Sequence, residues 1–157
     1  MREKTSIFPV ELLNNLSVSS QVSVPFTYGP GVQPIPLTVS EPPAGSLAVV
    51  SGWGTLHYGD TDLPSQLQAV EVYITPRDEC NSSYAVYDGI TENMICAGVP
   101  GGGKDPCRDD DGGPLVAGGQ LVGIVSWGLI CAEADYPGVY SNVATLRSFV
   151  TEQTGVQ

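Results

Sequence analysis

The sequence has few basic residues and no long apolar run. Of its 157 residues only 6 are Lys or Arg, whereas 17 are Asp or Glu, which gives a formal net charge of -11 at pH 7. Nucleic acids and anionic membranes bind proteins through clustered Lys and Arg, so we expect neither as a partner. The longest apolar stretches, such as residues 47–50, are far shorter than the roughly 20 residues of a membrane-spanning helix. We therefore expect a water-soluble chain.

The sequence also lacks the patterns of common metal sites. It has one histidine and no Cys-x-x-Cys pair, so His57 and the cysteines do not match a zinc site. Asp105 and Asp109–Asp111 are acidic, but they lack the alternating ligands and the terminal Glu of an EF-hand. We interpret this acidic loop as solvated, and we expect no metal and no cofactor.

The first 40 residues differ from the rest in charge. Their basic and acidic side chains cancel, so all of the net charge arises beyond residue 40. Because residues 1–5 precede no apolar core with a small-residue cleavage site, we expect no secretory signal peptide in this chain. An even number of cysteines nevertheless favours two disulfides and an oxidising compartment. Sequons for N-glycans at Asn15 and Asn81 agree with that compartment.

The chain contains 19 Gly and 13 Pro, which is typical of many turns between short strands. Residues that favour strands, bounded by turn residues, predict six strands. These are residues 46–53, 66–74, 94–97, 115–117, 120–127 and 138–143. A short helix is expected from about residue 75 to 80, and a second at 144–154, where Leu146, Phe149 and Val150 share one face. The sequence thus predicts an all-β barrel with a helix docked on it.

Five short motifs follow one another along the chain. They are Ser51–Gly54, Asn93–Gly98, Gly112–Val116, Gly123–Gly128 and Pro137–Tyr140. With these motifs in this order, the chain from about Val32 to its end resembles the trypsin-like serine proteases, in which the active site lies between two six-stranded antiparallel β-barrels. The resemblance implies that residues 32–157 form the second, Greek-key barrel. Residues 1–31 would then be a divergent remnant of the first barrel or a non-native head.

The resemblance also implies the pairing of the cysteines. Four cysteines allow three connectivities, and the family pattern implies bridges between Cys80 and Cys96 and between Cys107 and Cys131. Each bridge would restrict the unfolded chain and add roughly 3 kcal/mol of stability. Together with the family, the bridges imply an extracellular, secreted protein.

The catalytic positions depart from the family pattern. The family hydrolyses peptide bonds with a Ser nucleophile, a His base, an Asp that orients the His, and N–H groups that bind the oxyanion. Here Asp111 stands at the nucleophile position, Asp109 at an oxyanion-hole position, and Leu16 near that of the triad acid. The loop residue His57 does not match the catalytic His. The chain therefore lacks the Ser, His and Asp of the triad, and we expect it to be inactive.

The substrate pocket keeps more of the family pattern. Asp105 matches the carboxylate at the base of the trypsin pocket, which pairs with a Lys or Arg side chain. The residues that match the pocket walls are Ser126, Trp127, Gly128 and Gly138. Ile130 is expected to narrow the entrance.

Three functional interpretations remain open at this point. In the first, the chain is an inactive homologue that binds a protein or peptide weakly through a Lys or Arg side chain. In the second, it is a partial or altered form of an active secreted protease that cleaves after Lys or Arg. In the third, it is a plain structural β-domain. Asp111 favours the first over the second, because loss of an upstream segment would not change the nucleophile. A lone second barrel would expose the apolar face that normally packs on the first, and a protein partner or a second copy would cover it.

Overall fold

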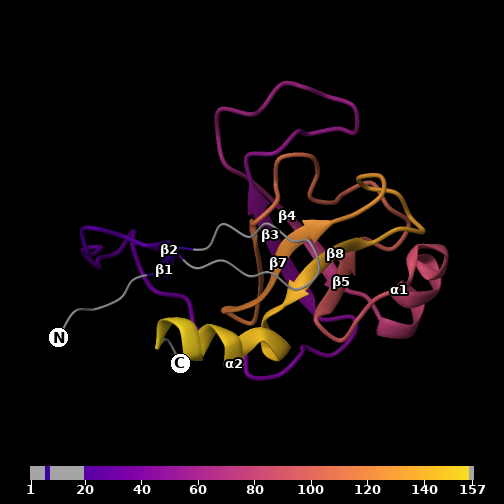
Figure 1. Ribbon diagram of the computed structural model, residues 1–157. Coiled ribbons are helices and arrows are strands. Elements are labelled where there is room, and N and C mark those ends of the chain that lie inside the picture. The colour runs from indigo at the N-terminus through magenta and orange to yellow at the C-terminus, as the bar shows by residue number, and fades with distance from the viewer. Residues whose placement is uncertain (1–5, 8–19, 156–157) are drawn as a thin grey trace.

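The protein, described by a computed structural model over residues 6–7 and 20–155, contains a closed antiparallel barrel of six strands (Figure 1). The strand order around the barrel is β3-β4-β5-β8-β7-β6. The strands are β3 Leu47–Gly52, β4 Gln68–Ile74, β5 Met94–Gly98, β6 Pro114–Ala117, β7 Gln120–Trp127 and β8 Gly138–Asn142. Each overlaps one predicted strand, so the all-β barrel expected from the sequence is confirmed.

Side chains along the strands alternate between the inside and the outside of the barrel, and the inward ones form its core. In β3, Ala48 and Val50 are buried, whereas Leu47 and Val49 point outward and are exposed. The β6–β7 hairpin turns through Gly118 and Gly119, whose φ values of 56° and 75° lie in the left-handed region that two-residue hairpin loops require. The buried core cluster comprises Ala48, Val50, Val72, Ile74, Ile95, Ala97, Leu115, Ala117, Val122, Val125 and Tyr140.

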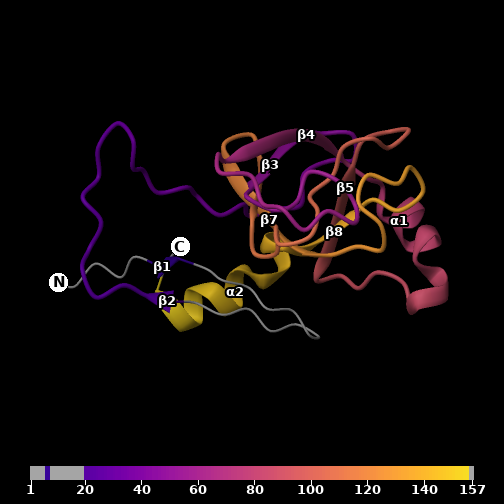
Figure 2. The ribbon, with the colours of Figure 1, turned by 90° about the horizontal axis from the view of Figure 1, so that it is seen from above.

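The C-terminal helix α2, Val143–Thr154, docks on the barrel as predicted. The side chain of Asn142 caps its first turn by accepting a hydrogen bond from the Ala144 N–H at 3.1 Å. The docking face differs from the predicted one, because Val143 and Val150 are buried against the barrel while Phe149 is 41% exposed. The buried stripe of α2 consists of Val143, Val150 and Thr154, and Phe149 lies outside it. Figures 1 and 2 show that α2 starts beneath the barrel and extends past it.

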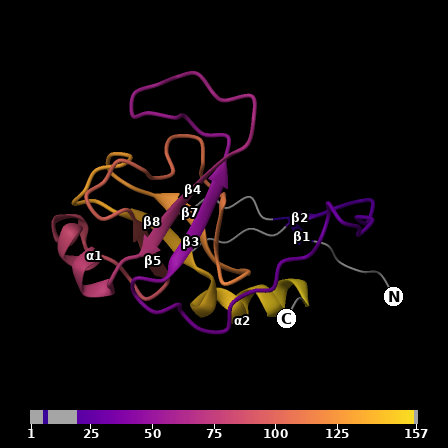
Figure 3. The same ribbon diagram turned by 180° about the vertical axis from the view of Figure 1, so that it is seen from behind.

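The other helix, α1, spans Arg77–Ser83 and lies on the side of the barrel away from β1 (Ser6–Ile7) and β2 (Ser20–Gln21) (Figure 3). It begins after Pro76 and continues beyond the predicted end at residue 80. A 3₁₀ turn that the sequence pattern did not predict follows at Ala85–Tyr87.

The segment before the barrel is tied to it by specific contacts. Leu37 forms an isolated parallel bridge with Leu121 of β7, and the Arg147 guanidinium of α2 donates to the Leu37 carbonyl oxygen at 2.9 Å. Arg77 of α1 donates to the Glu41 carboxylate at 2.8 Å. These contacts fix residues 37–41 against the strands and both helices.

Candidate functional site

The five residues predicted to bind a substrate line one cavity of about 530 Å³. This cavity, which we call the Asp105 pocket, lies between the 105–111 loop, the end of β7 and the start of β8. It is also lined by Cys107 and Cys131, which form one disulfide, whereas Cys80 and Cys96 form the other and join α1 to β5. These are the two pairs that the resemblance implies.

Asp105 is a largely buried carboxylic acid in the pocket. Its Oδ2 accepts a long hydrogen bond of 3.4 Å from the Ala132 N–H, and its Oδ1 is buried without a hydrogen-bond partner among the described residues. Burial raises the pKa of Asp105 from its ordinary 3.8 to about 7, and the negative charge of Asp110 adds to the rise. A cation that enters the pocket would therefore meet an acid whose charge is poorly compensated.

Tyr140 provides a second unpartnered oxygen beside Asp105, and sequence reasoning missed it. The residue is fully buried, and its hydroxyl has no hydrogen-bond partner in the described part of the chain. A Cβ at Gly138 would lie 2.8 Å from Asp105 Oδ1 and 3.4 Å from the Tyr140 hydroxyl oxygen. Gly138 therefore keeps open the space that both oxygens border. The only sequence signal was that Tyr140 ends the Pro137–Tyr140 motif.

Aromatic packing holds one wall of the pocket. The ring of Trp127 meets the ring of Tyr84 edge to face, with centroids 4.8 Å apart. The Tyr84 hydroxyl donates to the Pro137 carbonyl oxygen at 2.7 Å, which ties the 3₁₀ region to the start of β8. Desolvation raises the pKa of Tyr84 to about 12, and the nearby Asp105 carboxylate contributes to that rise. The wall is therefore built on a neutral, hydrogen-bonded Tyr.

The exposed residue Asp111 also lines the Asp105 pocket. Desolvation raises its pKa, and the adjacent charges of Asp109 and Asp110 raise it further. Asp109 is exposed with a left-handed φ of 69°, and it lies outside the lining of the pocket. Ile130, which was expected to narrow the entrance, does line the pocket and is 40% exposed.

Asp110 points away from the pocket into a slot beside β3. Its Oδ1 accepts a hydrogen bond from the Gly54 N–H at 2.7 Å, and its Oδ2 accepts one from the Cys107 N–H at 2.9 Å. A Cβ at either Gly52 or Gly54 would collide with the Asp110 carboxylate, so both glycines are needed for this fit. A cavity of about 380 Å³ borders the slot and is also lined by Asp105.

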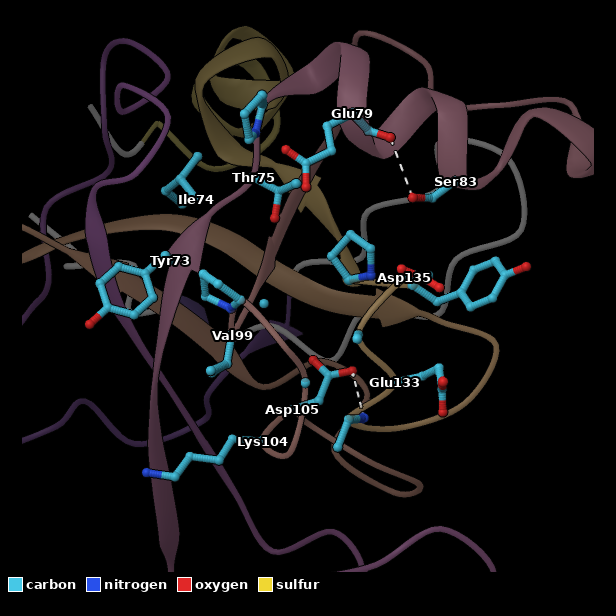
Figure 4. Close-up of a pocket in the computed structure, with 18 of the residues that line it drawn as sticks. Tyr73, Ile74, Thr75, Glu79, Ser83, Val99, Lys104, Asp105, Glu133 and Asp135 are labelled. Carbon is cyan, nitrogen blue, oxygen red and sulfur yellow. Dashed lines mark hydrogen bonds between the residues drawn. The ribbon is translucent and has the colours of Figure 1, made fainter.

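A further cavity of about 690 Å³ lies on another side of Asp105 (Figure 4). It is bordered by α1 and by the loops that carry Lys104 and Glu133, and the Asp105 carboxylate reaches its wall with the hydrogen bond to Ala132. Asp105 thus lines all three cavities. Asp105 therefore borders this cavity as well as the Asp105 pocket.

The remaining predicted residues do not join the pocket. His57 belongs to the long β3–β4 loop that extends away from the barrel in Figures 1 and 3; its side chain is 80% exposed, and its Nδ1 lies 3.1 Å from Asp60 Oδ2. Leu16 lies outside the described residues. Over residues 6–7 and 20–155, no three His, Cys, Asp or Glu side chains are grouped to hold a metal ion, and no helix is long and apolar enough to span a membrane.

Comparison with known proteins connects this geometry with one family. The Trypsin family model matches residues 10–150. Trypsin delta of Drosophila melanogaster is 47% identical over 140 residues, which cover 88% of this chain and 54% of that protein. Trypsin Blo t 3 of Blomia tropicalis is 45% identical over 137 residues, which cover 86% of this chain and 51% of that protein. This chain therefore spans about half the length of these relatives.

A solved structure gives the same result at the level of the fold. Neuropsin, described as a serine protease expressed in the limbic system of mouse brain, superposes with a TM-score of 0.79 and 34% sequence identity. The match covers 85% of this chain and 59% of the neuropsin chain. With the family model matching most of its length, the chain belongs to the trypsin family of serine proteases.

Proposed function

We propose that this chain is a non-catalytic member of the trypsin family that binds a Lys or Arg side chain of a protein or peptide in the Asp105 pocket. The observation that carries the proposal is Asp111, which stands at the nucleophile position and lines the same pocket as Asp105. Asp111 replaces the nucleophile that peptide hydrolysis requires, whereas Asp105 keeps the carboxylate that pairs with a Lys or Arg side chain.

The argument for inactivity rests on charge. A carboxylate attacks an amide poorly, and Asp111 would repel the negative charge that develops on the carbonyl oxygen. Asp109 stands where the family pattern has a glycine of the oxyanion hole, and its own negative charge adds to this repulsion. Because the groups of such a site act as a unit, the loss of two of them lowers the rate by many orders of magnitude.

The argument for binding rests on the base of the pocket. Asp105 lines the pocket, and its Oδ1 is buried without a hydrogen-bond partner among the described residues, so a guanidinium or ammonium group would supply a donor to it. The match to family walls at Ser126, Trp127, Gly128 and Gly138 supports entry of a long side chain. Affinity is expected to be weak, because Ile130, which lines the pocket and is 40% exposed, is expected to narrow its entrance.

Two measurements test this proposal. The first is hydrolysis of Lys and Arg esters and amides by the purified chain and by Asp111→Ser; we expect none from either, and hydrolysis that is lost on changing Asp111 would overturn the claim of inactivity. The second is titration with benzamidine, followed by NMR, at low and high salt. Binding should survive salt and disappear in Asp105→Asn, while Asp109→Asn serves as a control for general surface charge.

We further propose that residues 32–157 are the second barrel of a trypsin-type double barrel, with residues 1–31 a divergent remnant of the first barrel or a non-native head, and that the protein is extracellular. The disulfides support an oxidising compartment.

An exposed apolar strip lies on β3 and β4 and consists of Leu47, Val49 and Tyr73, which are 49%, 38% and 41% exposed. This strip supports the proposal that a protein partner or a second copy covers it. Sedimentation at micromolar concentration tests the second copy, since a stable monomer would contradict it.

A second candidate function is a partial or altered form of an active secreted protease that cleaves after Lys or Arg. The observation that favours it is that this chain spans only about half the length of the curated relatives it matches. Mass and N-terminal sequence of the protein from its source distinguish the two, together with the identity of residue 111 in that protein.

A further inference from the structure

The sequon that begins at Asn81 forms the last residues of α1 and is accessible. Asn81 and Ser82 are exposed, and Ser83 is half-buried. An exposed Asn followed by a residue other than Pro and then by Ser or Thr is the acceptor pattern for N-linked glycans. The other sequon of the chain begins at Asn15, which lies outside the described residues. The structure therefore bears on the sequon of α1 alone.

The two polar atoms of the Asn81 carboxamide have different surroundings. Its Oδ1 accepts a hydrogen bond of 2.9 Å from the Ile90 N–H, across the 3₁₀ turn that follows α1. Gly89, with a left-handed φ of 69°, makes room for this contact, because a Cβ there would collide with Oδ1. The Asn81 Nδ2 has no hydrogen-bond partner among the residues that the structure describes. Attachment of a sugar to Nδ2 would therefore leave the native hydrogen bond intact.

The position of Asn81 separates it from the three cavities. Asn81 lines none of them, whereas Ser82 and Ser83 line the cavity of about 690 Å³. The Asn81 side chain reaches instead across the 3₁₀ turn, where Val86 and Tyr87 are 83% and 51% exposed. Figures 1 and 3 show α1 at the outer side of the barrel. A bulky hydrophilic group on Nδ2 would thus lie beside exposed apolar side chains.

We propose that Asn81 carries an N-linked glycan, which covers Val86 and Tyr87 and leaves the Asp105 pocket open. The inference goes beyond the proposed binding function and rests only on the proposed extracellular location. The co-reactant is an oligosaccharide linked to a polyprenyl diphosphate. A bond forms between Nδ2 and the anomeric carbon of the first sugar, Nδ2 gives one proton to solvent, and the bond from that carbon to the diphosphate oxygen breaks as the lipid diphosphate leaves.

The two serines of the sequon provide a matched pair of variants. Each hydroxyl donates to the carbonyl oxygen four residues earlier, Ser82 to Asp78 at 2.8 Å and Ser83 to Glu79 at 3.3 Å (Figure 4). Ser83→Ala removes the hydroxyl that the sequon requires, whereas Ser82→Ala changes only its unrestricted middle position. Both variants keep Asn81 and its backbone contact, which the longer side chain of Asn81→Gln would displace.

The full chain, preceded by a secretion signal, is expressed in cultured mammalian cells and collected from medium and lysate. A variant that is secreted poorly is still informative, because the glycan is attached before folding. Digestion with peptide-N-glycosidase F in heavy-oxygen water converts each glycosylated Asn to labelled Asp, and peptide mass mapping separates Asn81 from Asn15. We expect the label at residue 81 in the unmodified chain and in Ser82→Ala, and its loss in Ser83→Ala. Ser83→Thr, which restores a sequon, should restore the label.

Each outcome supports or overturns the inference. Absence of the label at residue 81 from both fractions of the unmodified chain overturns it, and so does label that persists in Ser83→Ala, because spontaneous deamidation would then be its source. Cleavage after Tyr87 by chymotrypsin should be slower in Ser82→Ala than in Ser83→Ala, and equal rates overturn the covering role.

These readouts do not depend on ligand binding, so they are separate from the test of the proposed function with Asp105→Asn. If Asn81 is labelled in the expressed chain but carries no glycan in the protein from its source, the extracellular location on which the inference rests is overturned.

Discussion

The Asp110 carboxylate and the Gly54 backbone are joined by a hydrogen bond of 2.7 Å across 56 residues of sequence. Through this contact the loop that carries Asp105 and Asp111 is attached to the end of β3. The second oxygen of Asp110 accepts from the Cys107 N–H, so both acceptors of the carboxylate are used by backbone donors. Asp110 therefore anchors the loop that lines the pocket, and substitutions at Gly54 and at Asp110 should both disturb this anchor.

Gly54→Ala should destabilise the protein. A Cβ at Gly54 would lie 2.6 Å from the Arg108 carbonyl oxygen and would also collide with the Asp110 carboxyl group, so the backbone must shift. Such overpacking costs about 1–3 kcal/mol of unfolding free energy, measurable by urea denaturation. Gly31→Ala is the matched control, since a Cβ at Gly31 meets no atom within 4 Å. Equal midpoints for the two variants would contradict the proposed fit.

Asp110→Asn should also destabilise the loop, although the side chain keeps its shape. An amide offers one acceptor oxygen, so its NH₂ group must face either the Gly54 or the Cys107 N–H, and that donor loses its partner. An unsatisfied buried donor costs about 1–3 kcal/mol. Hydrogen exchange at these two amides should accelerate in Asp110→Asn and remain unchanged in Asp109→Asn, whose side chain lies 3.9 Å from the Arg108 guanidinium. Unchanged exchange in both would show that Asp110 is not an anchor.

The pKa of Asp105 predicts a pH dependence with a definite sign. Because burial raises this pKa from 3.8 to about 7, the folded state holds the proton more tightly than the unfolded chain. The associated stability is fully present below pH 3.8 and is lost as the pH rises through about 7. Relative to Asp105→Asn, the unmodified protein should lose about 2–3 kcal/mol between pH 5 and 8.5. Parallel stability curves for the two proteins would show that the carboxyl group is not held neutral by burial.

Local sequence patterns were sufficient for the barrel strands but not for every contact. Alternating apolar residues and turn residues reflect short-range geometry, and so each predicted strand was found. The face of α2 was predicted incorrectly at Phe149, because helical periodicity identifies a stripe of residues but not which edge of the stripe meets the barrel: Val150 is buried, whereas the adjacent Phe149 is exposed. The turn at Ala85–Tyr87 carries no periodic signal in its three residues.

The pocket shows the same division between local and distant information. The resemblance identified Asp105 and its walls, because these residues belong to short ordered motifs. It did not identify the unpartnered hydroxyl of Tyr140 or the presence of Asp60 in the pocket lining. Both depend on how distant segments meet: Tyr140 faces Asp105 across 35 residues, and Asp60 is brought there by a loop whose sequence has no regular pattern.

The final prediction separates the roles of the two disulfides. Cys107–Cys131 lines the Asp105 pocket and closes a loop of 24 residues, whereas Cys80–Cys96 ties α1 to β5 and closes a loop of 16. Chain-entropy arguments give each bridge about 3 kcal/mol, so replacing either pair by Ala should lower the unfolding free energy to a similar degree. Binding should respond differently. Without the first bridge, the loops of Asp105 and Ala132 lose their covalent link and depend on the hydrogen bonds from the Ala132 N–H to the Asp105 carboxylate and from the Gly103 N–H to the Ala132 carbonyl oxygen.

We therefore expect benzamidine affinity to fall about tenfold or more when the Cys107–Cys131 pair is replaced, which is the size of effect expected when a positioned charge-assisted hydrogen bond is lost. When the Cys80–Cys96 pair is replaced, the affinity should remain within about twofold. The comparison should be made well below each melting temperature, with NMR spectra to show that the barrel is folded. Because both variants lose a disulfide of similar loop length, general destabilisation would affect them equally. An equal loss of affinity would mean that the pocket depends on the stability of the whole barrel and not on the bridge beside Asp105.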